Sequence, residues 1–276
     1  MTVPLTALYA PGDRLDRVGK ALASGADIVI VDLEDAVAPS RKEQARAALA
    51  ELRPVHGVGL QVRVNARGGE WHEDDLAAVA GLPADVGVRL PKVQSGDEVR
   101  AVAERLPGRP IHALLESALG VERAFDIASA GVASIALGEA DLRSQLGLPR
   151  GVAGEPGLLW ARARIVYASA AAGIPAPMMS VYADLADPEG LAASCASGRA
   201  LGFVGRSAIH PAQLATIESA FAPTPDEVAR AREVLSRIAS ATADGVGTVV
   251  LDDGTFLDIA MLESARRTLA LADRRP

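Results

Sequence analysis

Glu116 and Asp141 each close a segment that begins as a short apolar run, IHALLE (111–116) and SIALGEAD (134–141). A buried apolar segment has no structural need to end in an acid. Carboxylate oxygens are the ligands that Mg²⁺ prefers, and water and substrate oxygens usually complete its octahedral shell. The two acids therefore predict a magnesium site that leaves room for a chelating substrate. For each of them, pairing with a nearby arginine or capping a helix is the alternative.

Three more carboxylates, Asp32, Glu34 and Asp35, follow the apolar run IVIV, and Arg63 lies near the end of another such run, LQVRVN. A guanidinium group inside a barrel can bind a carboxylate or an enolate oxygen in a forked geometry. The acids can hold water at the metal, orient Arg63 or serve as scaffold. An ion pair between Arg63 and one of the acids is the structural alternative.

Arg14, Arg17 and Lys20 follow the segment YAPGD (9–13) at a spacing of three residues. This spacing places three cations on one face near the start of a helix, where a phosphate or pyrophosphate group is bound favourably. An ordinary solvated helix face is the alternative interpretation.

Short β-branched runs alternate with longer alanine-rich stretches, which is typical of repeated βα units around a parallel sheet. Strands are predicted near residues 6–9, 27–32, 60–65, 86–90, 111–116, 134–138, 177–181 and 203–205. Eight such strands predict a (β/α)8 TIM barrel of the α/β class. The carboxyl ends of its strands share one rim, so we expect one site there to contain Asp32, Glu34, Asp35, Arg63, Lys92, Glu116 and Asp141.

The barrel is expected to occupy residues 1–222, and residues 223–276 a C-terminal helical and β arm. The arm is predicted to contain a helix at about 225–240, a hairpin around the Asp-Gly pair at 253–254 and a helix at about 259–272. Capping boxes, in which a Ser or Thr and a Glu three residues later satisfy free amides, are expected at Ser40, Ser95 and Thr224. Residues 150–157 are predicted to form a loop.

Composition narrows the possible partners. The net charge of −7 and the aromatic content of 3% argue against nucleic acid as a main partner. The single cysteine, Cys195, fits a reducing compartment. The N-terminal residues do not have the pattern of a signal peptide, and no apolar stretch is long enough to cross a membrane. We therefore expect a cytoplasmic protein that does not bind membranes.

The motifs taken together resemble those of a known family. They are YAPGDR (9–14), VDLEDAV (31–37), RVNARG (63–68), LPK (90–92), LESALG (115–120), LGEADL (137–142) and IHPAQ (209–213). In this order they are similar to the citrate lyase β subunits and their CitE-like relatives, which belong with the malyl-CoA lyases to the HpcH/HpaI aldolase superfamily. The resemblance extends over essentially the whole chain, the arm included.

The resemblance implies a Mg²⁺-dependent lyase that cleaves a 3-hydroxyacyl thioester, for example citryl thioester to oxaloacetate and acetyl thioester. By motif position, Glu116 and Asp141 would bind the metal, and Arg63 would bind the substrate carbonyl. Arg14, Arg17 or Lys20 would contact coenzyme A. Asp258 of the arm would enter a neighbouring subunit's site in a homotrimer or a multiple of it, where it could supply a proton.

Several alternatives remain open at this point. The substrate can be a free CoA ester of the citryl, citramalyl, malyl, β-methylmalyl or hydroxymethylglutaryl type, or an acyl thioester on a carrier protein beside a citrate lyase α subunit. Hydrolysis of malyl-CoA is also admissible. A non-catalytic, acyl-CoA-binding assembly subunit and a CoA-free aldolase for 2-oxo acids are the two competing classes.

Overall fold

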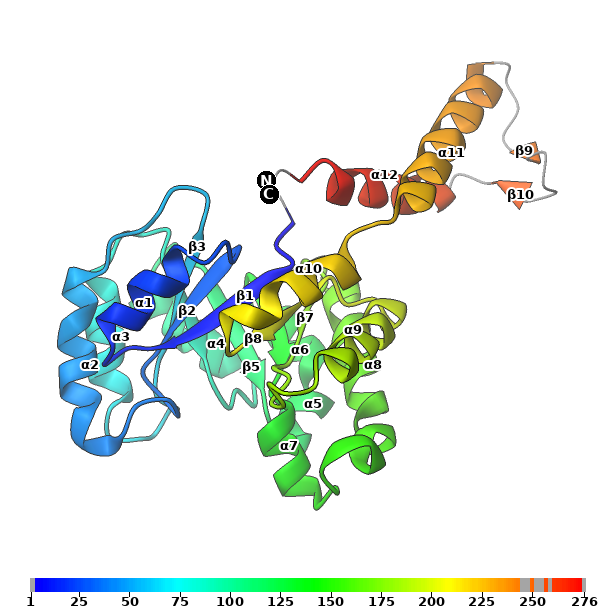
Figure 1. Ribbon diagram of the computed structural model, residues 1–276. Coiled ribbons are helices and arrows are strands. Elements are labelled where there is room, and N and C mark those ends of the chain that lie inside the picture. The colour runs from blue at the N-terminus through cyan, green and yellow to red at the C-terminus, as the bar shows by residue number, and fades with distance from the viewer. Residues whose placement is uncertain (1–2, 244–248, 251–255, 258–259, 275–276) are drawn as a thin grey trace. The chain divides into compact units, whose positions relative to one another are not determined.

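The computed structural model describes residues 3–243, 249–250, 256–257 and 260–274 (Figure 1). The chain divides into two compact units, one formed by Pro4–Ala220 and the other by Phe221–Pro276 together with Met1–Val3. Each unit is described by itself.

The first unit is an eight-stranded parallel sheet, as predicted. Its strands are β1 (Thr6–Pro11), β2 (Ile28–Asp32), β3 (Gly59–Arg63), β4 (Gly87–Leu90), β5 (Ile111–Leu115), β6 (Ser134–Leu137), β7 (Met178–Met179) and β8 (Gly205–Ala208). The hydrogen-bonded order is β6-β5-β4-β3-β2-β1-β8-β7, and β6 also contacts β7, so the sheet curls into a nearly closed barrel. Because the strands are parallel, their carboxyl ends all lie on one rim of the barrel.

Helices connect the strands on the outside of the barrel, and Figure 1 shows α1, α2 and α3 beside β1, β2 and β3. The helices are α1 (Leu15–Leu22), α2 (Lys42–Ala48), α3 (His72–Ala80), α4 (Gly96–Arg105), α5 (Ala118–Glu122), α6 (Ala124–Ala128), α7 (Glu139–Leu146), α8 (Glu155–Ala171), α9 (Pro188–Leu201) and α10 (Leu214–Phe221).

The strands are buried on both faces, which explains their continuous apolar runs. In β2, Val29, Ile30 and Val31 are all buried, and α1 packs Val18 and Ala21 toward the sheet. Aliphatic side chains thus fill both the inside of the barrel and the layer between sheet and helices. The rim residues follow directly from these buried strands.

Three expectations about local structure were wrong. Strand β8 begins at Gly205 and not at 203, because the amide of Phe203 still binds the carbonyl of Gly198 at the end of α9, where Gly202 has a φ of 101°. Ser40 lies in a 3₁₀ turn, Pro39–Arg41, and does not cap α2. The segment expected as a loop at 150–157 is a 3₁₀ turn, Gly151–Gly154, followed by the start of α8.

The other two caps form. The amide of Glu98 donates to Ser95 Oγ at 3.4 Å, and the amide of Glu227 donates to Thr224 Oγ1 at 3.2 Å. Thr224 also donates its own amide to Glu227 Oε2 at 2.7 Å, so this capping box is complete.

The second unit contains α11 (Pro225–Ala243), β9 (Val249–Val250), β10 (Phe256–Leu257) and α12 (Ala260–Ala272). Its core is formed by Ala231, Val234 and Ile238 of α11 against Ala265 of α12. Strands β9 and β10 pair in antiparallel fashion, as a hairpin requires, while the expected turn at 253–254 and Asp258 lie outside the described residues. In the part of the chain that the structure describes, no helix combines the length and the apolar content that a membrane span needs.

Candidate active site

Arg63, the last residue of β3, is fixed by Asp32, the last residue of β2. The register pairs these two residues directly, and Arg63 donates from Nε and Nη2 to the two oxygens of Asp32 at 2.7 and 2.6 Å. The guanidinium carbon also lies 5.1 Å from the centre of the Tyr9 ring. Burial alone would lower the pKa of Arg63, but the hydrogen bonds and charge of Asp32 raise it. The site therefore contains a permanent, oriented cation.

Glu34 and Asp35 surround the remaining nitrogen of Arg63. Nη1 lies 3.1 Å from Glu34 Oε2 and 3.4 Å from Asp35 Oδ2. The Glu34 contact does not have the geometry of a hydrogen bond, so this buried oxygen has a charge partner but no hydrogen-bond partner. Burial raises the pKa of Glu34, although the charge of Arg63 opposes this effect. Asp35 is exposed.

Lys92 joins this group to Glu116 and Asp141. Its Nζ donates to Glu34 Oε1 at 2.8 Å and lies 3.7 Å from Asp141 Oδ2, and its backbone amide donates to Glu116 Oε1 at 3.1 Å. The side chains of Lys92 and Asp141 are half-exposed, whereas Glu116 is buried. The seven polar residues expected at the rim thus form one connected cluster that runs from a buried ion pair to the solvent.

The pKa of the Glu116 carboxyl group is raised. Burial, assisted by the negative charges of Glu34 and Asp141, raises its pKa to about 8. Its side chain lies over Gly138, the residue that follows β6; a Cβ atom there would lie 2.7 Å from Glu116 Oε2. The carboxyl group is consequently held close to the start of α7, which carries Asp141.

The donor set of Glu116 and Asp141 fits a hard divalent cation. Both are oxygen ligands, both contact Lys92, and Asp141 is close enough for its negative charge to raise the pKa of Glu116. Among the described residues, no three His, Cys, Asp or Glu side chains converge as a complete cage. Two carboxylates suit Mg²⁺, which commonly retains water or substrate oxygens.

Glu139, the first residue of α7, belongs to a different network. Arg162 of α8 binds both of its oxygens, at 2.7 and 2.6 Å, and also binds Glu155 at 2.6 Å. Glu139 is thus paired with Arg162, and Asp141 is the acid of this segment that meets Lys92.

Lys42 supports the turn that carries Glu34 and Asp35. Its buried Nζ donates to the carbonyl oxygens of Leu33 and Glu34 at 2.7 and 2.6 Å and to Asn65 Oδ1 at 2.7 Å. Asn65 in turn donates to Asp75 of α3 at 2.6 Å. Burial lowers the pKa of Lys42. This network holds the turn that carries Glu34 and Asp35 in place.

The three cations of the first helix lie at the surface. Arg14 pairs with Asp16 at 2.9 Å, while Arg17 and Lys20 are exposed on α1. A fourth cation nearby, Arg41, pairs with Asp13 at 2.8 Å and was not predicted. Exposed ion pairs of this kind are weak and yield readily to a stronger anion.

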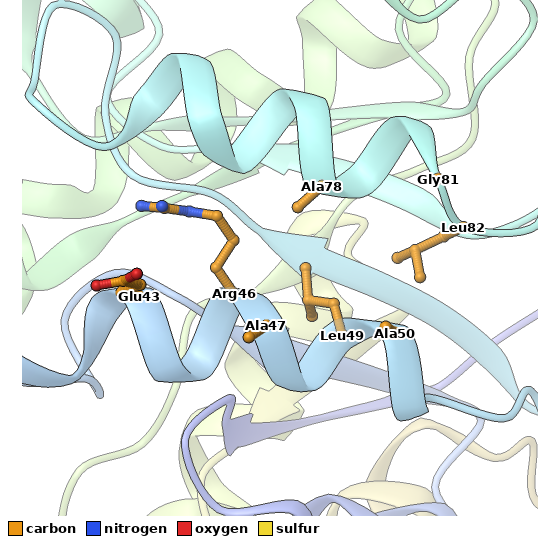
Figure 2. Close-up of a pocket in the computed structure, with 8 residues that line it drawn as sticks. All are labelled: Glu43, Arg46, Ala47, Leu49, Ala50, Ala78, Gly81 and Leu82. Carbon is orange, nitrogen blue, oxygen red and sulfur yellow. The ribbon is translucent and has the colours of Figure 1, made fainter.

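A groove of about 350 Å³ lies on the outside of the barrel between α2 and α3 (Figure 2). Apolar side chains such as Leu49 and Leu82 line it, with Arg46 at one end. The guanidinium of Arg46 already binds Asp74 and Asp75, at 3.3 and 3.0 Å. None of the rim residues lines this groove.

The family model for HpcH/HpaI aldolase/citrate lyase matches residues 5–211 of the chain. A (3S)-malyl-CoA thioesterase of Cereibacter sphaeroides is 36% identical over 275 residues, which cover 97% of this chain and 94% of the relative. The citrate lyase subunit beta of Escherichia coli strain K12 is 35% identical over 282 residues, which cover 96% of this chain and 92% of the relative.

A similar solved structure is that of the protein CitE from Mycobacterium tuberculosis in complex with magnesium, acetoacetate and coenzyme A. It has a TM-score of 0.85, with 33% sequence identity and 99% coverage of both chains. Since this match covers nearly the whole of both chains, the likeness extends beyond the fold of the barrel alone.

Proposed function

This chain belongs to the HpcH/HpaI aldolase/citrate lyase family, and on that premise we propose that it is a Mg²⁺-dependent carbon-carbon lyase of the citrate lyase β subunit type. It would cleave a 3-hydroxyacyl thioester to a 2-oxo acid, such as oxaloacetate, and an acyl thioester. The observation that supports this most is the connected rim cluster, in which a fixed cation, Arg63, and a pair of carboxylates, Glu116 and Asp141, flank one site.

The residues of this cluster match the needs of retro-Claisen cleavage. Glu116 and Asp141 would hold the magnesium ion. Bound there, magnesium would supply a Lewis acid that polarises the oxygens of the oxo acid. Arg63, kept charged and oriented by Asp32, would stabilise the negative charge that develops on the thioester oxygen. Glu34 and Asp35 would hold Arg63 in place through their ion pairs with its third guanidinium nitrogen.

The acyl thioester would be a CoA ester, bound through the cations of α1. Arg14, Arg17 and Lys20 would contact its phosphates, and Arg41 lies near the same segment because it pairs with Asp13. The CitE structure that this chain resembles contains coenzyme A as well as magnesium, which supports both cofactor assignments.

Asp258 would supply the final proton, and it would do so in the site of a neighbouring subunit. This role rests on the family resemblance of the arm, and it requires a homotrimer or a multiple of three.

A cytoplasmic location agrees with a CoA-dependent reaction. Partnership with a citrate lyase α subunit and an acyl carrier protein remains a further option, because the E. coli relative is a citrate lyase subunit.

The test is to incubate the protein with Mg²⁺ and a panel of citryl-, citramalyl-, malyl- and hydroxymethylglutaryl-CoA, and to identify the products by mass. We expect a 2-oxo acid and a shorter acyl-CoA from at least one ester.

Glu116→Gln and Asp141→Asn should each abolish most of this activity and lower Mg²⁺ affinity while circular dichroism stays unchanged, because they remove charge at the rim and not core packing.

Other products would identify the alternatives. Free CoA and malate without carbon-carbon cleavage would indicate a thioesterase like the C. sphaeroides relative. Cleavage of a small oxo acid by a protein that does not bind CoA in calorimetry would indicate a CoA-free aldolase. No Mg²⁺-dependent product, together with a stable acyl-carrier partner in a pull-down, would indicate a non-catalytic assembly subunit.

A further inference from the structure

Lys92 has an unusual backbone conformation. Its φ of 55° is the only positive value of a non-glycine residue in the described ranges 3–243, 249–250, 256–257 and 260–274. The left-handed region costs an L-residue with a Cβ atom roughly 1 kcal/mol or more. Such strain persists only where the surroundings compensate for it. At Lys92 the compensation is visible, since this conformation directs the amide to Glu116 Oε1.

The side chain of Lys92 is placed among the acids by the same conformation. Its Nζ lies 2.8 Å from Glu34 Oε1 and 3.7 Å from Asp141 Oδ2. Glu34 already has Arg63 as a charge partner, whereas Asp141 has no second cation among the ion pairs of the described residues. Lys92 therefore contacts both proposed metal ligands. Its neutral backbone amide binds Glu116, and its positively charged ammonium group lies near Asp141.

We propose that Lys92 is a resident counter-cation that sets the affinity of the carboxylate pair for its divalent cation. This inference rests on the proposed function. Without the metal, the ammonium group reduces the repulsion among Glu34, Glu116 and Asp141. When the metal is present, the same positive charge repels it and weakens its binding. Because the Lys92 side chain is half-exposed, the ammonium group can move away from Asp141 and remain bound to Glu34.

The proposal makes Lys92 a cation that competes with the metal, and this fixes the expected direction of the effect. A residue that only supported the site would weaken metal binding when removed. A competing cation would strengthen metal binding when removed, because a positive charge near a divalent ion opposes its binding at these short distances.

The experiment is a calorimetric titration of the full chain with Mg²⁺ alone, at one fixed pH for all variants. We expect Lys92→Met to bind Mg²⁺ about tenfold more tightly than the unsubstituted protein or better. Lys92→Arg, which keeps the charge, should bind within about threefold of the unsubstituted protein. Arg100→Met removes an exposed cation of α4 whose ion-pair partners are Asp97 and Asp126 and not the rim acids; it is the matched control and should leave the affinity unchanged.

A second readout is thermal unfolding with and without Mg²⁺. Lys92→Met should unfold at a lower temperature than the unsubstituted protein in the absence of metal, because three carboxylates have lost a counter-charge. It should gain more stability from saturating Mg²⁺. If Lys92→Met does not fold, Lys92→Gln removes the same charge but keeps a hydrogen-bond donor for Glu34.

Unchanged or weaker Mg²⁺ binding by the folded charge-removing variant would overturn this inference alone. Absence of Mg²⁺ binding by the unsubstituted protein would overturn the proposed metal site, and with it the proposed function. The two failures are therefore distinguishable in the same titration.

Discussion

Arg63 and Asp32 form a buried, two-point ion pair, and such a pair is seldom retained for stability alone. Removing two charges from water has a large desolvation cost, which the attraction between them offsets only when the geometry is good. Here both oxygens of Asp32 are used, at 2.6 and 2.7 Å, and the third guanidinium nitrogen faces Glu34 and Asp35. The arrangement gives a preorganised cation whose orientation does not depend on the substrate.

His112 offers a test of the interior of the barrel by pH. It lies in β5, with Nδ1 2.8 Å from Ser134 Oγ of β6, and burial together with the charge of Arg89 lowers its pKa to about 3. The unfolded chain takes up a proton near the ordinary histidine value of about 6.5, while the folded chain does not. This histidine therefore contributes stability above about pH 6.5, and the contribution is lost as the pH falls toward 3.

We expect the free energy of unfolding to fall by roughly 2 kcal/mol between pH 7 and pH 5 on account of His112. In His112→Asn, which preserves a polar contact to Ser134, this part of the pH dependence should disappear. Urea unfolding at the two pH values measures it. The exposed His56 provides the control, since His56→Asn should leave the pH dependence as it is. An unaltered slope in His112→Asn would show that other groups cause it.

At the scale of elements, the strands were the most predictable part of the molecule. Parallel strands buried on both faces require continuous apolar runs, so residues 27–32 and 111–116 identified β2 and β5 almost to the residue. Local capping was less predictable. Thr224 and Ser95 cap their helices, but Pro39 begins a 3₁₀ turn that displaces Ser40 from the start of α2.

The grouping of the candidate site residues at one rim could be predicted from the sequence, but their contacts could not. Glu116, Asp141 and Arg63 could be found because polar residues at strand ends share a rim. The bridging position of Lys92 could not be found, because its φ of 55° depends on the tertiary contact with Glu116. Asp258 falls outside the described residues, so its role stays a prediction.

Gly138 lies between β6 and α7 and packs against the side chain of Glu116, which follows β5. Its substitution tests whether this contact positions Glu116. A Cβ atom at this position would come closest to Cγ of Glu116, and it would lie 2.7 Å from Oε2 and 2.8 Å from the carboxyl carbon of the same side chain. The end of a flexible side chain can yield, so Gly138→Ala should fold, but Glu116 should be displaced. We expect Mg²⁺ affinity to fall about tenfold or more, measured by calorimetry.

Gly19→Ala in α1 is the matched control for this substitution, because a Cβ atom there would have no neighbour within 4 Å. It should leave Mg²⁺ affinity unchanged and make unfolding slightly harder, since alanine favours the helix. Wild-type metal affinity in Gly138→Ala would show that the glycine does not control the position of Glu116.

At the scale of the whole molecule, the second unit has its own small core around α11 and α12. Residues beyond the barrel that build a core of their own serve a purpose other than completing the eight βα units. The proposed purpose is to present Asp258 to a neighbouring subunit, which requires an assembly in which each site takes residues from two chains.

Subunit mixing tests this proposal. Asp258→Asn and Arg63→Ala should each fold, assemble and lose activity. After equal amounts exchange subunits at random, about a quarter of the sites should combine an intact Arg63 with an intact Asp258, so activity should return to about that fraction. Light scattering follows the assembly, and differently tagged chains report the exchange. Exchange without recovery would confine the active site to one chain.

The order of the strands has a consequence for how the barrel moves. The ladder starts at β6 and ends at β7, and β7 has only two residues, so in the described barrel the edge between these strands has fewer backbone hydrogen bonds than the others. Beyond the strands, the amide of Glu139 reaches Ser180 Oγ at 3.4 Å across this edge. Asp141 follows β6, whose ladder partner is β5. Amide hydrogens along this edge should therefore exchange with solvent sooner than those of β2 and β3. The segment that carries Asp141 can yield through this local opening while the strand pairs that hold Asp32 and Arg63 stay closed.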